Sequence, residues 1–413
     1  MRLLTCMLAT AAAWDSLEWL GGGFRGPSCA DKRWVALFNE TQTRMLAGVI
    51  GPRFVVVTPH SKAGLGNRLR AVRAGLALAA LTKRCLVLDY SSLDPEHRGR
   101  RAGESRWLDG TELDVLAPNL VRWDVARALY EATAKVRGRD AWTLPMNGKG
   151  LDGGKLLAYN GLAMVVAAWN HDPTAKLLRA PAVRSAAAAA GLADDDDASR
   201  GCALRALFAP TPALAGALAA ARASLGPGAT LDAAVHLRTN IEYDRGWGRM
   251  TCRDVGCWTD VAAVFSRCAR ALARRATTLL VAADDDGLVD AARARARADF
   301  GAAVALPGRV RHHSGISRAE KQLALEASQS HVLGHGDVLG PLLDMLLIAS
   351  ADAFVGTAGS SFSEQARDWG GFGGDRKAVL FTTPYVKSYQ GDADSAPLPA
   401  TPAEADLACR SVT

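Results

Sequence analysis

Residues 60–70, His-Ser-Lys-Ala-Gly-Leu-Gly-Asn-Arg-Leu-Arg, separate a short apolar strand from an amphipathic helix. The β-branched run at 54–57 predicts the strand, and 85–89 predicts a second strand after the helix. Apolar residues at helical spacing predict the helix itself: Leu69, Val72, Leu76 and Ala80. This order predicts a parallel sheet, and the glycine-bearing loop with its cations predicts an anion site at the helix N-terminus. A tight turn without a ligand is the alternative.

A second series of alternating strands and helices occupies about residues 229–385. Strands are predicted at 232–237, 278–283, 301–306, 352–356 and 378–381. Helices are predicted between them at 259–275, 287–299 and 338–350. The alternation predicts a second parallel sheet, with ligands at the carboxyl ends of its strands.

The bulk composition indicates a globular protein of two domains. The 413 residues are too many for one small core, and 49% are hydrophobic while 22% are charged. The net charge of +7 comes mainly from scattered arginines and suits an anionic small ligand or an acidic surface. No basic stripe is interleaved with aromatic residues, so we expect no nucleic-acid partner.

The N-terminus and the cysteines suggest a secretory protein. A positive start and a short apolar run make residues 1–15 a predicted signal peptide or short anchor, so membrane association is expected only there. A buried N-terminal helix is the alternative. Eight cysteines lack the spacing of a zinc site. In an oxidising lumen Cys252 could pair with Cys257 and Cys29 with Cys409, leaving at least one thiol free.

A loop after the strand at 232–237 carries an arginine and two acids. Arg238 is a planar donor that suits a phosphate oxygen. Glu242 and Asp244 are candidates for orienting or deprotonating an acceptor hydroxyl. An ordinary ion pair within the loop is the alternative.

The loop after the strand at 352–356 contains Ser360, Ser361 and Phe362 at the start of a predicted helix. Serine hydroxyls and backbone N–H groups at a helix start can form a phosphate cradle. The alternative is a serine that only caps the helix. Because this loop and the loops at 60–70 and 236–244 each follow a strand, we expect them to open onto one cleft.

Taken together, these segments resemble the GT-B fucosyltransferase superfamily, which includes α1,6-, xyloglucan and protein O-fucosyltransferases and bacterial nodulation relatives. The resemblance covers 60–89, 232–244, 280–285 and 335–366. It implies an α/β protein with two Rossmann-like domains whose parallel sheets face a central cleft. The acceptor-side domain would span 16–225, the GDP-sugar-binding domain 229–385, and a C-terminal tail 386–413.

The resemblance also implies an inverting transfer of fucose from GDP-fucose to a glycan or protein hydroxyl, with no metal or other cofactor. Arg238 takes the place of the arginine that holds the diphosphate, and Glu242 and Asp244 complete the expected catalytic set. The expected donor-binding residues are Gly64, Gly66, Asn67, Arg68, His236, Arg238, Asp284, Ser360, Ser361 and Phe362. The expected location is the lumen of the Golgi or the endoplasmic reticulum.

The acidic run Asp284-Asp285-Asp286 leaves a second chemistry open. Paired carboxylates after a strand also hold a divalent cation in metal-dependent transferases of other nucleotide sugars. In the fucosyltransferase reading the first acid touches the nucleotide and the others cap the following helix. A third alternative is a non-catalytic relative that only binds a nucleotide sugar or a glycan.

Overall fold

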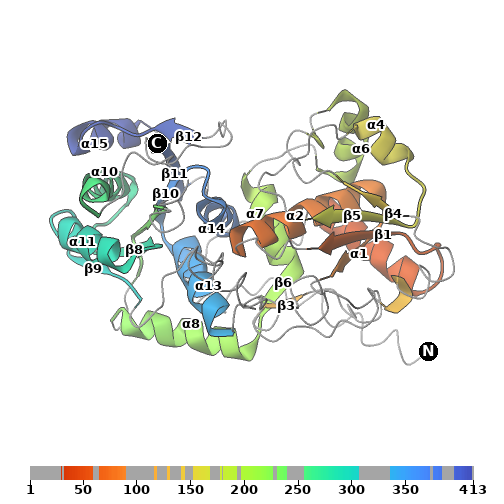
Figure 1. Cartoon of the computed structure of the whole chain (residues 1–413), viewed down its shortest axis with the longest axis horizontal. Helices are drawn as coiled ribbons and strands as arrows, with labels where there is room; N and C mark the ends of the chain where they lie inside the picture. The colour runs from red at the N-terminus through yellow and green to blue at the C-terminus, as the bar shows by residue number, and fades with distance from the viewer. Residues whose placement is uncertain are drawn as a thin grey trace, which may run out of the picture. The chain divides into compact units, whose positions relative to one another are not determined.

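The computed structural model describes residues 29, 32–58, 65–89, 116–118, 128–130, 141–144, 152–167, 177–178, 180–192, 197–226, 230–239, 255–306, 335–372, 375–383 and 395–411. The chain forms two compact units (Figure 1). Of the described residues, the first unit holds those up to Ala209 except Leu65 and Gly66. The second unit holds these two residues and everything from Pro210 onward.

The first unit contains a parallel sheet in the order β2-β1-β5-β4. Its strands are β1 (Phe54–Thr58), β2 (Cys85–Leu88), β4 (Ala141–Thr143) and β5 (Ala163–Ala167). The predicted helix is α2 (Leu65–Thr82), which connects β1 to the parallel β2. The other described elements of this unit are α1 (Arg33–Leu46), β3 (Leu116–Pro118), α4 (Gly153–Ala158), α6 (Pro181–Ala190), α7 (Asp197–Leu207) and β6 (Phe208–Pro210), whose last residue already belongs to the second unit.

A buried arginine ties the first sheet together. Arg84, 1% exposed, precedes β2 and donates hydrogen bonds to the carbonyl oxygens of Tyr159, Gly161 and Leu162. Its guanidinium carbon also lies 5.2 Å from the centre of the Tyr159 ring. Arg84 therefore connects the start of β2 to the turn that precedes β5, two strands away in the sheet.

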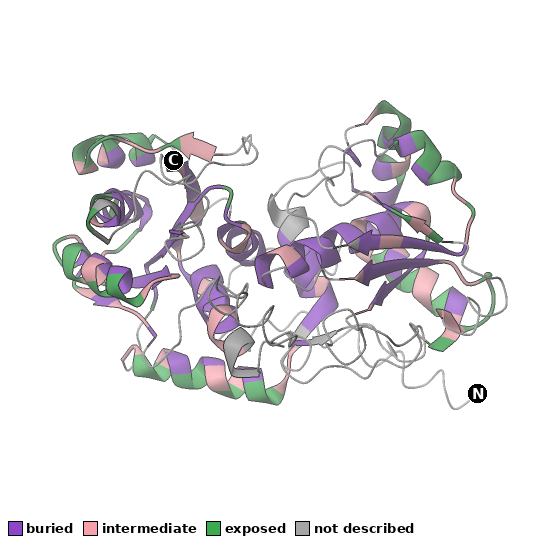
Figure 2. Cartoon of the chain, in the orientation of Figure 1, coloured by how far each residue is buried: buried purple, intermediate pink, exposed green. Residues whose placement is uncertain are grey.

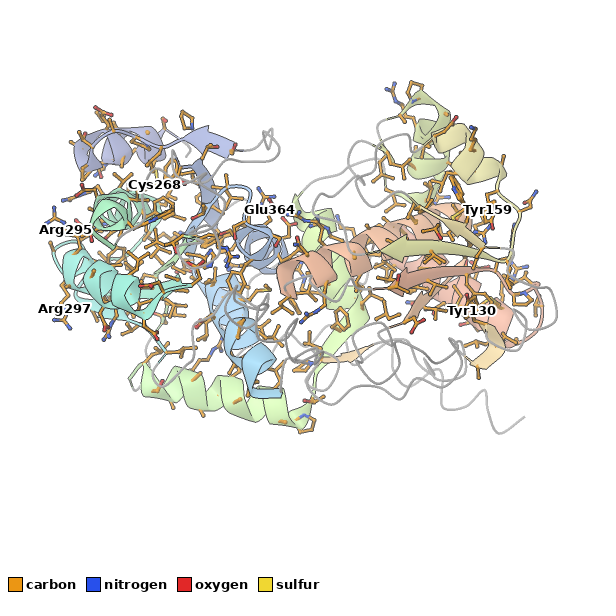
Figure 3. The ribbon with its side chains drawn as sticks, viewed as in Figure 1. Tyr130, Tyr159, Cys268, Arg295, Arg297 and Glu364 are labelled. Carbon is orange, nitrogen blue, oxygen red and sulfur yellow. A yellow bond between two sulfur atoms is a disulfide. The ribbon has the colours of Figure 1, made fainter. Side chains whose placement is uncertain are left out.

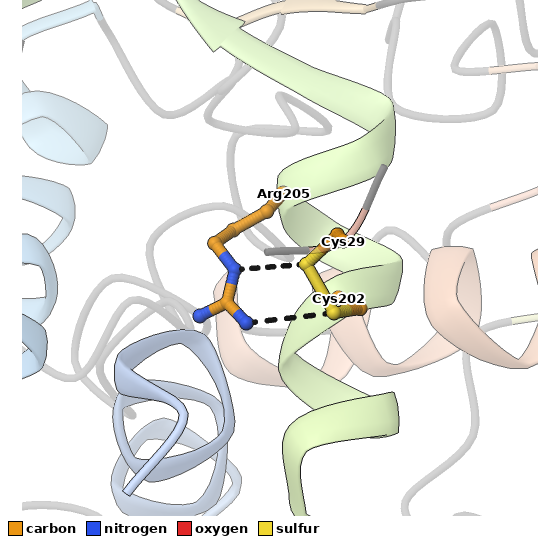
Figure 4. Close-up of a disulfide and its surroundings, with 3 residues drawn as sticks. All are labelled: Cys29, Cys202 and Arg205. Atoms are coloured by element: carbon orange, nitrogen blue, oxygen red, sulfur yellow. Dashed lines mark hydrogen bonds between the residues drawn. A yellow bond between two sulfur atoms is a disulfide. The ribbon is translucent and has the colours of Figure 1, made fainter. Parts of the chain in front are cut away.

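Among the described residues, two disulfides join distant segments, one in each unit. Cys29 is bonded to Cys202 on α7, and the Arg205 guanidinium donates to both sulfurs at 3.3 and 3.6 Å (Figure 4). The pairing of Cys29 with Cys409 considered from the sequence is wrong, because Cys409 is bonded to Cys268. Cys252 lies outside the described residues.

The second unit contains a parallel sheet in the order β12-β11-β10-β7-β8-β9. Its strands are β7 (Ala233–Leu237), β8 (Thr278–Ala283), β9 (Ala302–Val304), β10 (Ala353–Thr357), β11 (Lys377–Thr382) and β12 (Ser395–Pro397). Its helices are α8 (Pro212–Ser224), α10 (Val255–Leu272), α11 (Asp286–Ala296), α13 (His335–Ser350), α14 (Ser361–Gly370) and α15 (Pro402–Arg410). The strands predicted in this region are present, and β12 and α15 lie in the stretch that the sequence treats as a tail.

Helices cover both faces of this second sheet. Helices α10, α11 and α15 lie on one face, and α13 and α14 lie on the other (Figure 1). The central strands are buried along their whole length, whereas α15 turns one side to solvent (Figure 2). The Cys268–Cys409 disulfide fastens α15 to α10. Among the described residues, no helix has the length and apolar character needed to span a membrane.

A second buried arginine closes the ends of two helices in this unit. Arg376, 4% exposed, donates to the carbonyl oxygens of Ala349, Ala351 and Gly370, at the ends of α13 and α14. The last carbonyl groups of a helix have no partner inside that helix, and a cation beside them interacts favourably with the negative end of the helix dipole. Burial lowers the pKa of Arg376 to about 10, so the side chain stays charged at neutral pH.

Replacing this arginine should destabilise the second unit. Arg376→Met keeps most of the apolar stem but leaves three buried carbonyl oxygens without their donor, so we expect a loss of roughly 3 kcal/mol in the free energy of unfolding. Urea denaturation measures it. The matched control is Arg295→Met on the exposed side of α11 (Figure 3), which should change stability by less than about 0.5 kcal/mol. Equal effects of the two substitutions would contradict this role of Arg376.

Candidate functional site

The polar residues of the candidate site gather where β10, β7 and β8 end. These strands are neighbours in the sheet, and the chain passes from β7 to β8 on one side while β10 lies on the other. A change of strand order of this kind opens a crevice at the carboxyl edge of a parallel sheet, where ligands bind. Arg238 follows β7, Asp284 follows β8 and Ser360 follows β10. The start of the second loop thus lies against the third loop, where Arg238 and His236 contact Thr357 and Ser363, while the expectation that all three loops open onto one cleft stays a prediction.

His236, near the end of β7, is locked to the first turn of α14. Its Nδ1 lies 2.7 Å from the Ser363 hydroxyl oxygen, and its ring stacks on Phe362 with centroids 4.5 Å apart. Ser363 also accepts a hydrogen bond from the backbone N–H of Thr357, which leaves its own hydrogen able to donate to Nδ1. The hydroxyl of Ser363 thus links the His236 ring to the end of β10. Burial lowers the pKa of His236 to about 3, so the ring is neutral at physiological pH.

The Thr357 hydroxyl bridges the ends of β10 and β7. It donates to the carbonyl oxygen of His236 at 3.2 Å and accepts from the backbone N–H of Arg238 at 3.0 Å. Thr357 is fully buried. The backbone that enters the loop at Arg238 is thus fixed by a side chain 119 residues away.

Two glycines allow α14 to start this close to the sheet. A Cβ on Gly356 would lie 3.0 Å from the Ser363 Cβ and 2.7 Å from the Phe354 ring, so any larger residue would push α14 away. Gly359 has a φ of +74°, the left-handed conformation that glycine adopts without strain. The chain can therefore turn directly from β10 into the helix.

Ser360 is the N-cap of α14, as the alternative reading of this loop predicted. Its hydroxyl oxygen accepts the backbone N–H of Ser363 at 3.3 Å, and the residue is 6% exposed. Ser361 and Phe362 form the first turn and are half-buried. The N-terminal end of the helix, with its partial positive charge, thus lies beside the end of β7.

Arg238 is held by a carboxylate from the neighbouring strand. Its Nη1 lies 3.2 Å from Asp284 Oδ2, with the two side chains 17% and 7% exposed. Asp284 Oδ1 accepts two hydrogen bonds from Thr239, from its backbone N–H at 2.9 Å and its hydroxyl at 2.8 Å. This ion pair joins the loop to the end of β8, whereas the alternative read from the sequence was an ion pair within the loop, whose acids Glu242 and Asp244 lie outside the described residues.

The two acids after Asp284 belong to the following helix. Asp285 is the N-cap of α11 and accepts the backbone N–H of Leu288 at 2.8 Å, while Asp286 lies exposed in the first turn. Of the two later acids predicted to cap a helix, Asp285 does so, while Asp286 is the first residue of the helix. In the part of the chain that the structure describes, no three acids, histidines or cysteines are grouped as a metal site would require.

Gly66 belongs to the second unit and lies against the first turn of α14, since a Cβ there would lie 2.6 Å from the backbone carbonyl carbon of Ser361. Asn67 and Arg68 belong to the first unit, where Arg68 is 3% exposed. Gly64, Glu242 and Asp244 are outside the described residues. Their contact with a donor stays a prediction.

Sequence reasoning missed three hydroxyl residues of the cluster: Thr239, Thr357 and Ser363. Each is at most 1% exposed and connects two segments. Their positions at or just after the end of a strand, or in the first turn of a helix, can be read from the sequence, but their hydrogen-bond partners cannot.

No protein-family model matches this sequence, and no curated protein matches it. Solved fucosyltransferases match the structure. A mutant of Arabidopsis thaliana FUT1 in complex with GDP aligns over 92% of this chain and 84% of its own, with 15% identity and a TM-score of 0.50. NodZ from Bradyrhizobium aligns over 77% and 93%, with 13% identity and a TM-score of 0.42. POFUT1 in complex with GDP aligns over 80% and 99%, with 12% identity and a TM-score of 0.39.

The similarity to FUT1 is a similarity of fold. The predicted fold class, α/β with two parallel sheets of the GT-B kind, is confirmed. The fold that the resemblance read from the sequence implied is the fold that the structure has.

The buried neutral His236 should make stability depend on pH. Its pKa is about 3 in the folded protein against an ordinary 6.5, so acid favours the unfolded state, which binds the proton. This contribution is fully present above pH 6.5 and is lost as the pH falls from 6.5 towards about 3.

Urea denaturation of the wild type and of His236→Asn checks this prediction. Between about pH 8 and about pH 5, the wild type should lose about 2 kcal/mol more than the variant. Parallel pH profiles for the two proteins would show that His236 is protonated in the folded state as easily as in the unfolded one.

Proposed function

We propose that this chain is an inverting glycosyltransferase that transfers fucose from GDP-fucose to a hydroxyl of a glycan or protein without a metal cofactor. The observation that carries the proposal is that Arg238 and the N-terminus of α14 lie at the same carboxyl edge of a parallel sheet, after the neighbouring strands β7 and β10. A fixed guanidinium and a helix N-terminus together suit a diphosphate. The fold shared with FUT1, which was solved with GDP, supports the same ligand class.

The chemistry follows from where charge develops. As the bond from the sugar to the diphosphate breaks, the sugar becomes oxocarbenium-like and negative charge grows on the leaving group. Arg238 and the backbone N–H groups of α14 would stabilise that charge through preorganised hydrogen bonds. Inversion needs no covalent nucleophile, because the acceptor hydroxyl attacks the anomeric carbon directly. Glu242 or Asp244 is the proposed base that takes the hydroxyl proton.

The two disulfides favour an oxidising compartment, so we propose the lumen of the secretory pathway as the location. Disulfides that close loops of this kind are rare in reducing compartments. The acceptor would then be a glycan or glycoprotein on the same route.

The experiment that tests the function measures binding first and turnover second. Thermal shifts with GDP-fucose, GDP-mannose and UDP-sugars should be largest for GDP-fucose, and a preference for UDP-sugars would overturn the proposal. GDP release that requires an acceptor would identify a catalyst, whereas a non-catalytic relative would show only the thermal shift. Turnover that survives EDTA would exclude a metal-dependent transferase.

Substitution of Arg238 should abolish most of the activity. Arg238→Ala removes the charge beside the leaving group, so we expect turnover and GDP affinity to fall at least about 100-fold, or roughly 3 kcal/mol. Steady-state kinetics and calorimetry with GDP measure the two effects. Arg295→Ala on exposed α11 is the control for a general loss of positive charge and should change neither. Near-normal activity of Arg238→Ala would rule out this mechanism.

A further inference from the structure

We infer that Asp284 is a positioning residue of the donor site, which orients Arg238 and does not contact the donor. The inference rests on the proposed function and deepens it. It differs from both sequence-based readings of this acid, as a nucleotide contact and as a metal ligand.

Both carboxylate oxygens of Asp284 are engaged by protein groups. Oδ1 accepts the N–H and the hydroxyl of Thr239, and Oδ2 lies against Arg238 Nη1. The side chain is 7% exposed. A buried carboxylate that already accepts bonds at both oxygens has little capacity left for a ligand.

The same bonds fix the loop on both sides of the arginine side chain. Thr357 holds the backbone N–H of Arg238, and Asp284 holds the N–H of the next residue, Thr239. The ion pair then fixes the guanidinium itself. Because the backbone and the side chain of Arg238 are both fixed before a ligand arrives, binding costs little conformational entropy at this residue.

Electrostatic repulsion also argues against direct contact between the Asp284 carboxylate and the diphosphate. Two negative groups in contact within a buried site repel each other strongly, whereas a guanidinium between them satisfies both. Arginine suits this place because its planar fork carries five N–H donors, enough to serve a carboxylate and a phosphate together. Asp284 would therefore act on the donor through Arg238.

Asp284→Asn separates the two tasks of the carboxylate. The amide oxygen can still accept both bonds from Thr239, while the amide nitrogen replaces Oδ2 and faces Arg238 as a second donor. The orientation of the loop should survive and the hold on the guanidinium should be lost. Asp285→Asn is the matched control, because the neighbouring acid only caps α11.

A double-mutant cycle on GDP affinity decides whether Asp284 acts through Arg238. We expect Asp284→Asn to weaken GDP binding about 10-fold and Arg238→Ala about 100-fold, with the double variant no weaker than Arg238→Ala alone. Asp285→Asn should bind GDP as the wild type does. A further 10-fold loss in the double variant would mean that Asp284 touches the nucleotide directly and would overturn the inference.

Hydrogen exchange of the Thr239 amide gives a readout that needs no ligand. Mass spectrometry with fragmentation to single residues should show protection in the wild type, in Asp284→Asn and in Asp285→Asn, and fast exchange in Asp284→Ala. Equal protection in Asp284→Ala would overturn the positioning role. If the wild type fails to bind GDP while the exchange pattern is as expected, the proposed function fails and the role of Asp284 in holding the loop stands.

Discussion

The carboxyl end of β7 is buried, and this burial forces the polar groups there to find partners within the protein. The Thr357 hydroxyl joins the backbones of His236 and Arg238, and Ser363 joins Thr357 to the His236 ring. The contact of Ser363 with the His236 ring depends on Gly356, because a Cβ there would lie 3.0 Å from the Ser363 Cβ. The backbone of Arg238 is held by Thr357 within the sheet itself.

The charge of the cluster follows from the same burial. Desolvation lowers the pKa of His236 and keeps its ring neutral, so the ring adds no positive charge next to the Arg238 guanidinium. Asp284 balances Arg238 without removing its capacity to donate further hydrogen bonds. The α14 N-terminus adds a partial positive charge that needs no counter-ion. A dianionic ligand would be attracted here by the Arg238 guanidinium and by the partial positive charge of the α14 N-terminus.

The sequence predicted the sheet architecture and the residues with distinctive chemistry. Strand and helix periodicity is local, so the strands and helices of the second region appear close to their predicted positions. The partners of Thr239, Thr357 and Ser363 could not be predicted, because they lie 45 to 127 residues away in the chain. The same limit applies to Cys29, whose partner depends on which helix passes beside it in space.

The acidic run shows why residue type alone does not assign a role. Asp284, Asp285 and Asp286 have the same side chain, yet the first pairs with Arg238, the second caps α11 and the third faces solvent. The difference arises because β8 ends at Ala283 and α11 begins at Asp286, so each acid occupies a different place between strand and helix. The cluster formed by Asp284, Arg238, His236 and the first turn of α14 lies wholly within the second unit. The diphosphate chemistry proposed for it is therefore a property of one sheet edge.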